Sequence, residues 1–331
     1  MSDKPVVFSG IQPTGTTHIG NYFGAIARWV SEQDAFFNIF CLVDMHAITV
    51  PQDPAELHAK TLETAAILLA AGIDPEKSAL FVQSDVAEHA ELAWLLNGIA
   101  SMGQLNRMTQ YKEKSAESRE RSTVGLFTYP LLMASDILLY GTRYVPVGAD
   151  QKQHVELTRD LAQRFNATFG ETFVLPEPTI PAVGARIMGL DDPTKKMSKS
   201  TARAGHAVGV LDPPDAIRNA IMSAKTDSGT EIRLDPERPG VSNLLTIYIA
   251  ATGVSPAEAE AHFAGKGYGA LKREIVDALV ERLGPLQRRY AELRSDDDAL
   301  RSILRRSADA IRPIARQTYE KAKRAMGVGL A

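Results

Sequence analysis

The sequence is poor in several features that mark particular classes of protein. It contains one cysteine, Cys41, which excludes an intramolecular disulfide and any metal site built on a cluster of cysteines. No apolar run approaches the about 20 residues that span a bilayer, and the first residues lack the basic and apolar regions of a secretory signal. We therefore expect a reduced, cytoplasmic protein in which Cys41 is a buried structural thiol.

The net charge of the whole chain is small, but the last part of the chain is basic. The 37 Lys and Arg residues nearly balance 40 Asp and Glu residues, which gives a net charge of −3. Residues 286–331 differ, because eleven basic residues there oppose six acidic ones. Such a region can face RNA, or it can be the solvated side of a helix pair. The charge alone does not decide between these two interpretations.

The order of apolar and polar residues predicts an α/β protein with two parts. With 331 residues, the chain is long for a single core. Up to about residue 190, strand-like and helix-like segments alternate, which is typical of βαβ units and a parallel sheet. The expected strands lie at 5–9, 36–43, 78–83 and 143–147, and the expected helices at 55–71, 88–101, 128–140 and 151–165. After residue 200 the chain is almost entirely helical, and Pro213-Pro214 and Ser255-Pro256 each open a helix.

Two short segments indicate nucleotide chemistry. Residues 12–21 (QPTGTTHIGN) follow an apolar run and precede a helical pattern, so they form a strand-to-helix turn. Such a turn presents unpaired backbone N–H groups and the positive end of a helix dipole, which suit a phosphate chain. Residues 196–200 (KMSKS) place two lysines in a loop, where they can follow charge through a phosphoryl transition state.

This combination resembles the class I aminoacyl-tRNA synthetases, in which an HIGH-type sequence follows the first strand and KMSKS lies far downstream. Residues 18–21 (HIGN) depart from HIGH at the last position, whereas residues 196–200 match KMSKS in full. Further segments resemble the bacterial, tryptophan-specific branch of the family, and the resemblance extends from residue 8 to about residue 326. These segments are VDMHAIT (43–49), YPLLMASDILLY (129–140), VPVGADQKQH (145–154), GARIM (184–188) and DPT (192–194).

The resemblance implies a fold and an activity. It implies a Rossmann-type parallel-sheet catalytic domain over residues 1–200, ending in the KMSKS loop, and a helical tRNA- and anticodon-recognition domain over 201–331. The implied activity is the ligation of L-tryptophan to tRNA(Trp), with ATP as a substrate and Mg²⁺ bound to it. The resemblance also implies a homodimer, and no association with a membrane is expected. Two alternatives stay open: a tyrosine–tRNA ligase, and a non-catalytic paralogue that binds tRNA or tryptophan.

The expected tryptophan site is centred on one carboxylate. Asp136 lies one helical turn after Met133, so the two share a helix face, and its carboxylate can accept the indole N–H. Without the resemblance, Asp136 could equally cap or bridge helices, and His46 could be a satisfied core histidine. The resemblance implies that the remaining tryptophan-binding residues are Phe8, Gln12, Val43, His46, Tyr129, Met133, Val145, Val147 and Gln151. Of these, Tyr129 and Gln151 offer oxygens to the α-amino group.

The expected ATP site combines the two motifs. The resemblance implies ATP-binding residues Gln12, Pro13, Thr14, His18, Gly20, Asn21, Gly148, Ala149, Asp150, Ile187, Lys196, Met197, Ser198, Lys199 and Ser200. It implies catalytic roles for His18, Lys114, Lys196 and Lys199, although Lys114 could equally be a surface lysine. No side chain is expected to ligate a metal, because phosphates and water hold the Mg²⁺ of ATP. Residues 201–205 (TARAG) differ from the Asp-Pro continuation common in the family, so we expect a different loop hinge.

Overall fold

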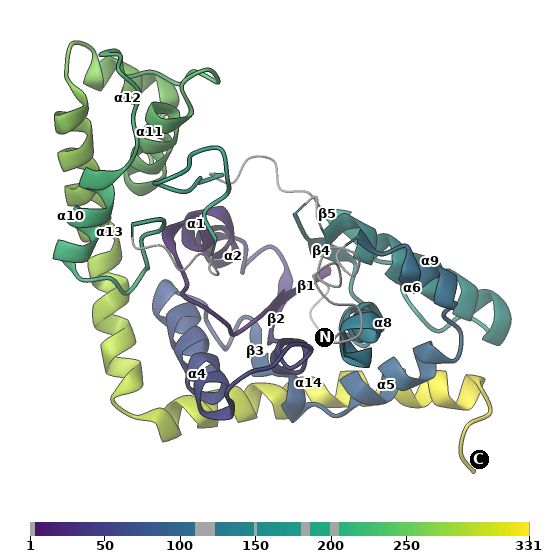
Figure 1. Cartoon of the computed structure of the whole chain (residues 1–331). Coiled ribbons are helices and arrows are strands. Elements are labelled where there is room, and N and C mark those ends of the chain that lie inside the picture. Colours follow the sequence, from purple (N-terminus) through teal and green to yellow (C-terminus); the bar gives the residue numbers. More distant parts are fainter. Residues whose placement is uncertain (1–3, 110–122, 149–150, 180–185, 199–204, 331) are drawn as a thin grey trace.

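A computed structural model of the chain describes residues 4–109, 123–148, 151–179, 186–198 and 205–330 (Figure 1). Within them, five strands form one parallel sheet in the order β3-β2-β1-β4-β5. The strands are β1 (Val6–Ile11), β2 (Phe37–Leu42), β3 (Ala79–Val82), β4 (Tyr144–Pro146) and β5 (Glu177–Thr179). The predicted parallel sheet is therefore confirmed. Its order reverses between β1 and β4, and open sheets of this kind bind ligands at such a switch point.

The central strands are buried because helices cover both faces of the sheet, as is usual for parallel sheets. Five of the six residues of β2 are buried, and Cys41 in this strand is fully shielded from solvent. Burial raises the pKa of the Cys41 thiol well above its ordinary value. The prediction of a buried structural thiol is confirmed.

Side-chain caps start several helices of this part. The bounds are α1 (Ile19–Asn21), η1 (Tyr22–Ile26), α2 (Ala27–Ser31), α3 (Asp44–Ala47), α4 (Pro54–Ala71), η2 (Gln83–Asp85), α5 (Glu88–Asn97), α6 (Met102–Asn106), α8 (Val124–Leu138) and α9 (Lys152–Phe169). Among the helices that begin at such a cap are α4, α6 and α8. The helix predicted over 88–101 ends earlier, at Asn97, and a separate helix, α6, begins after Ser101, which forms a capping box with Gln104. The short strand β5 was not predicted.

The second half is helical in the described residues, as expected. Its helices are α10 (Pro214–Ser223), α11 (Pro239–Thr252), α12 (Pro256–Phe263), α13 (Tyr268–Arg294) and α14 (Asp297–Ala325). Pro214 and Pro256 each stand in the first turn of a helix, which confirms the two predicted helix starts. No helix of the described ranges is both long and apolar enough to cross a membrane.

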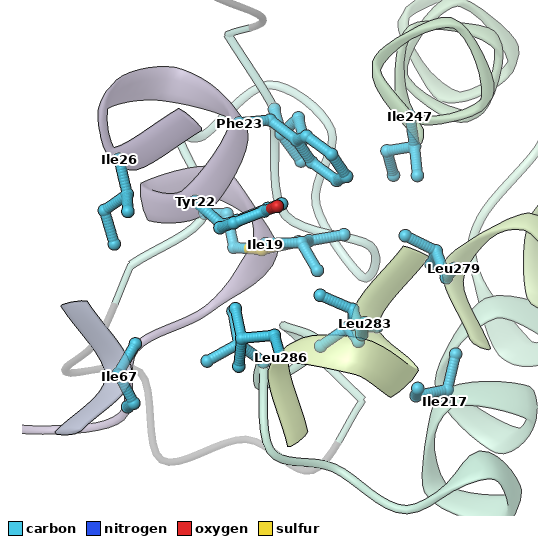
Figure 2. Packing of buried hydrophobic residues seen from close by; sticks show 14 of the residues in the cluster. Ile19, Tyr22, Phe23, Ile26, Ile67, Ile217, Ile247, Leu279, Leu283 and Leu286 are labelled. Atoms are coloured by element: carbon cyan, nitrogen blue, oxygen red, sulfur yellow. The ribbon is translucent and has the colours of Figure 1, made fainter. Parts of the chain in front are cut away.

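The helix that follows the HIGN turn packs against the helical half. Ile19, Tyr22 and Phe23 share a buried cluster with three leucines of α13 (Figure 2). Ile217 of α10 and Ile247 of α11 complete the contact, and the three leucines are Leu279, Leu283 and Leu286. The two halves of the chain are therefore joined by apolar packing next to the motif.

The last helix has a different place from the other four. In Figure 1, α14 runs along the sheet-bearing unit and contacts β3 and α5, away from α10–α12. Ala308, Ile311 and Ala315 of α14 belong to the same core cluster as Phe81 of β3. Packing therefore places residues 297–325 with the sheet, although they follow the boundary expected near residue 200. An amphipathic pattern predicts that a helix buries one face, but not which element covers that face.

The packing of α14 generates a stability prediction. Ile311→Ala should lower the free energy of unfolding by about 2–5 kcal/mol, because it leaves a cavity between α14 and the sheet. The exposed Arg305 of the same helix is the control, and Arg305→Ala should change the value by less than about 0.5 kcal/mol. Urea unfolding followed by circular dichroism measures both. Equal effects of the two substitutions would contradict this placement of α14.

Candidate active site

A cavity of about 310 Å³ lies at the carboxyl ends of β1, β2 and β4, a volume at the lower end of the range of small-molecule sites. All ten residues predicted to bind tryptophan line it: Phe8, Gln12, Val43, His46, Tyr129, Met133, Asp136, Val145, Val147 and Gln151. They come from strands, loops and helices far apart in the sequence. The structure thus brings the predicted set together, and contact of these residues with tryptophan stays a prediction.

One wall of this cavity contains a buried carboxylate with three donors. Asp136 of α8 is 1% exposed. Its Oδ1 accepts hydrogen bonds from Gln83 Nε2 at 2.7 Å and His89 Nδ1 at 2.6 Å. Its Oδ2 accepts from His46 Nε2 at 2.7 Å. Among the described residues, Oδ2 therefore keeps acceptor capacity for one further donor.

The same neighbours keep Asp136 ionised. Burial raises the pKa of the carboxyl group, but the charge and hydrogen bond of His46, together with those of His89, lower it more. The net effect brings the pKa to about 2. At neutral pH the cavity therefore presents an ionised group that can only accept hydrogen bonds.

A second layer of polar groups orients His89. The Tyr140 hydroxyl lies 2.7 Å from His89 Nε2, and the Ser135 hydroxyl donates to the His89 carbonyl at 2.7 Å. Burial raises the pKa of Tyr140 well above its ordinary value, so this hydroxyl keeps its proton and can donate to Nε2. That bond places the remaining imidazole proton on Nδ1, where it faces Asp136.

Sequence reasoning missed Gln83, His89 and Tyr140. Their only signal in the sequence is the presence of polar groups in segments that are otherwise buried. The hydrogen bonds of these three side chains join residues 47–53 positions apart, which no local pattern encodes.

Tyr129, predicted at the α-amino end of the substrate, has a fixed hydroxyl. It lies 2.6 Å from Nε2 of the buried His154, a residue that was not predicted. Burial raises the pKa of Tyr129 to about 12, so the phenol is neutral at physiological pH. Its ring meets that of His46 edge to face, with centroids 6.2 Å apart.

The HIGN turn is held by its own residues. His18 is 2% exposed, and its Nδ1 accepts the Asn21 N–H at 3.3 Å, while its own N–H donates to Asn21 Oδ1 at 3.2 Å. Asn21, at the position that departs from HIGH, thus completes a capping box. A Cβ atom at Gly20 would lie 2.9 Å from His18 Nδ1, so no larger residue fits there without a shift.

A second cavity lies beside this turn. Its volume is about 550 Å³, and its lining includes three residues predicted to bind ATP, namely Gln12, Thr14 and Asn21. It shares Gly10, Gln12 and Trp29 with the first cavity, so the two are neighbours. Of the other predicted ATP-binding residues, Pro13 is buried in the turn and Gly148 lines the first cavity.

The described part of the KMSKS segment meets the HIGN turn. Met197 is 2% exposed, and its Cβ lies 3.6 Å from the position of a Cβ built on Gly20. The Met197 N–H donates to the Ile187 carbonyl at 3.2 Å, while Lys196 is exposed and Ser198 is partly buried. Lys114, Ala149, Asp150, Lys199 and Ser200, which were predicted for the site, lie outside the described residues.

Metal binding by side chains has no visible candidate in the part of the chain that the structure describes. This part contains no group of three or more His, Cys, Asp or Glu side chains that could hold a metal ion. A Mg²⁺ ion that enters with ATP can be held by phosphate oxygens and water, and it then needs no such cluster.

Comparisons with known proteins agree with this geometry. The family described as tRNA synthetases class I (W and Y) matches residues 1–284. A tryptophan–tRNA ligase of Wolinella succinogenes is 55% identical over 325 residues, which cover 98% of this chain and 99% of that protein. A tryptophan–tRNA ligase of Helicobacter pylori is 53% identical over the same shares.

Two solved structures extend the comparison to the fold. A tryptophanyl-tRNA synthetase from Mycoplasma pneumoniae has a TM-score of 0.89 at 36% identity, with 98% of each chain covered. One from Campylobacter jejuni, complexed with ADP and tryptophan, has a TM-score of 0.85 at 36% identity, covering 98% of this chain and all of that one. The chain therefore belongs to the class I tRNA synthetases. Within this class its place is among the tryptophanyl-tRNA synthetases of bacterial type.

The Asp136 network generates a prediction for substrate binding. Asp136→Asn should raise the KM for tryptophan about 10- to 100-fold, because a charge-assisted hydrogen bond is lost in a buried site. The KM for ATP should change less than about twofold, since Asp136 does not line the cavity beside the HIGN turn. Steady-state kinetics of amino-acid activation measure both constants. The exposed Glu156→Gln is an isosteric control, and a parallel rise of both KM values would refute the assignment.

Proposed function

We propose that this chain activates L-tryptophan with ATP and transfers the tryptophanyl group to the 3′ end of tRNA(Trp). The observation that supports this most directly is the cavity of about 310 Å³, in which an apolar slot ends on an ionised acceptor. Gln12 of the segment 12–21 lines this cavity, and Met197 of the KMSKS segment packs against Gly20 of the segment 12–21. The ADP and tryptophan bound in the Campylobacter structure give the same pair of ligands for a relative.

The chemistry of the cavity favours an indole over a phenol. Phe8, Val43 and Val145 supply apolar walls, and Oδ2 of Asp136 supplies an acceptor for the indole N–H. At the other end of the cavity, the side-chain oxygens of Tyr129 and Gln151 accept hydrogen bonds from the α-amino group of tryptophan. Phenylalanine has no donor for this buried charge, and tyrosine presents its hydroxyl at the end of a single ring, at a different position from the indole N–H.

In the first step, the tryptophan carboxylate attacks the α-phosphorus of ATP. A P–O bond to the amino acid forms, the bond to pyrophosphate breaks, and the products are tryptophanyl-adenylate and pyrophosphate. No side chain acts as a nucleophile. The chain's own contribution is to position the two substrates in line and to neutralise charge with Lys196 and Lys199. The Mg²⁺ bound to ATP supplies further neutralisation.

In the second step, a hydroxyl of the terminal ribose of tRNA(Trp) attacks the acyl carbon and displaces AMP. We assign tRNA contacts to residues 201–331, including the exposed Arg305 and Arg306 of α14. Arg316, by contrast, is engaged with Glu88, Glu91 and Glu320. Phosphate contacts by free arginines would make the binding of tRNA depend on salt.

We further propose that the protein acts as a homodimer. Large apolar side chains are exposed on α8 and on the two helices that contact it, with Trp94 of α5 at 77%, Met102 of α6 at 67% and Val124 of α8 at 79%. Exposed apolar groups gathered on neighbouring elements favour association. Val124 begins the helix that contains Tyr129 and Asp136, so such an interface would lie close to the tryptophan cavity.

The experiment that tests the proposed function is ATP–pyrophosphate exchange with tryptophan, tyrosine and phenylalanine supplied separately. We expect exchange with tryptophan and less than about 1% of that rate with the other two, because phenylalanine has no donor for Asp136 and tyrosine carries its donor at a different position from the indole N–H. Exchange with tyrosine would keep the class of reaction but contradict the side-chain assignment. Absence of exchange with all three would favour the non-catalytic alternative.

A further inference from the structure

Two segments that flank the KMSKS loop are tied into the active site by backbone hydrogen bonds. The first stem (residues 187–197) bonds to itself, with the Gly189 N–H donating to the Lys195 carbonyl at 2.8 Å. The second stem (residues 205–210) bonds to the HIGN turn, because the Ile19 N–H donates to Val208 and the Val210 N–H donates to Thr17, both at 2.9 Å. The second stem is thus held against the turn, and the first stem bears Lys196.

His206 of the second stem is where the two stems meet. Its carbonyl accepts the Leu190 N–H at 2.9 Å, and its Nδ1 is hydrogen-bonded to the Asp191 carboxylate. The His206 side chain is 5% exposed, and that of Asp191 is 25% exposed. A Cβ atom at Gly189 would lie only 2.4 Å from His206 Cε1, so the ring packs directly on the glycine backbone. Three consecutive residues of the first stem therefore contact one histidine.

We propose that Asp191 and His206 are positioning residues for amino-acid activation: their hydrogen bond joins the two stems and sets where Lys196 lies relative to the HIGN turn. The proposal rests on the proposed function, since it assumes that Lys196 neutralises the phosphates. Asp191 and His206 are not placed in contact with substrate. Their effect passes through the backbone, from Asp191 and Gly189 to Lys195 and then to Lys196.

The chemistry of the pair explains why it can fix a position. Burying a polar ring is unfavourable unless it is hydrogen-bonded. The His206 ring is bonded to Asp191 through Nδ1, whereas its Nε2 is buried without a hydrogen-bond partner among the described residues. A bond to an ionised carboxylate is stronger and more directional than one between neutral groups. The two residues lie fifteen positions apart in the sequence, so their hydrogen bond restrains both ends of the segment between them. Neither residue lines the tryptophan cavity.

The test uses two substitutions of His206 in the full-length enzyme. His206→Leu keeps the volume of the side chain but removes its donor, and His206→Asn keeps an N–H close to the position of Nδ1. We expect His206→Leu to lower kcat of tryptophan-dependent ATP–pyrophosphate exchange about tenfold, because a small displacement of a catalytic group has effects of this size. The KM for tryptophan should stay within twofold, and His206→Asn should recover most of the rate.

A second histidine–carboxylate pair, which does not border the KMSKS loop, serves as the control. His262 and Glu274 form a histidine–carboxylate pair between α12 and α13, with 2.5 Å between Nε2 and Oε2. We expect His262→Leu to leave kcat within about twofold of the wild-type value, because this pair does not border the loop. If His206→Leu folds poorly, Asp191→Ala removes the same hydrogen bond by changing its more exposed partner. This variant should also show a lower kcat with a KM for tryptophan within twofold of the wild-type value.

A matched pair of lysines separates the failure of this inference from failure of the proposed function. Lys196→Ala should slow exchange strongly, and the adjacent, exposed Lys195→Ala should not. A slow Lys196→Ala with an unaffected His206→Leu would overturn the positioning role alone. An unaffected Lys196→Ala would overturn the lysine role and the inference with it. Equal losses in His206→Leu and His206→Asn, or a parallel rise in the KM for tryptophan, would show that the pair serves only packing.

Discussion

The active site depends on one buried, ionised carboxylate. Asp136 is held by Gln83, His46 and His89, which come from η2, α3 and α5, and it lies itself on α8. A charge in this position is destabilising unless donors surround it, so these four elements must assemble for the carboxylate to stay ionised. The cavity is therefore organised before any substrate arrives. Oδ2 of Asp136 can accept one further hydrogen bond, and it faces a slot of apolar side chains. These two features restrict the chemistry of the ligand more than the volume of the cavity does.

The topology of the sheet brings the two cavities together. β1 lies between β2 and β4, so the turn after β1 stands at the point where the strand order reverses. The same turn is hydrogen-bonded to the stem that follows the KMSKS loop, and the helix after the turn packs on α10, α11 and α13 (Figure 2). The HIGN segment therefore contacts the sheet, the loop stems and the helical half. A movement of the helical half would be transmitted to the loop through these contacts.

Much of this could be predicted from the sequence, and the omissions have physical causes. Alternating strand and helix patterns were sufficient for the parallel sheet, and prolines marked the starts of α10 and α12. The ten cavity residues were identified because motif segments preserve residue types at fixed spacing. Gln83, His89 and Tyr140 were missed because hydrogen bonds between distant elements leave no local pattern. The contact of α14 with β3 was missed for the same reason. The roles of Lys114, Asp150 and Lys199 stay predictions.

The most direct test of the central claim is equilibrium binding of two ligands to the wild-type enzyme. L-Tryptophan and 3-benzothienyl-L-alanine have nearly the same shape, but the second replaces the indole N–H by sulfur. If the ionised Asp136 recognises the N–H, the analogue should bind at least about 100-fold more weakly, since the buried charge then lacks its donor. In Asp136→Asn this difference should shrink, because the amide oxygen is a neutral and weaker acceptor. Equal affinity of the wild-type enzyme for both ligands would contradict the claim.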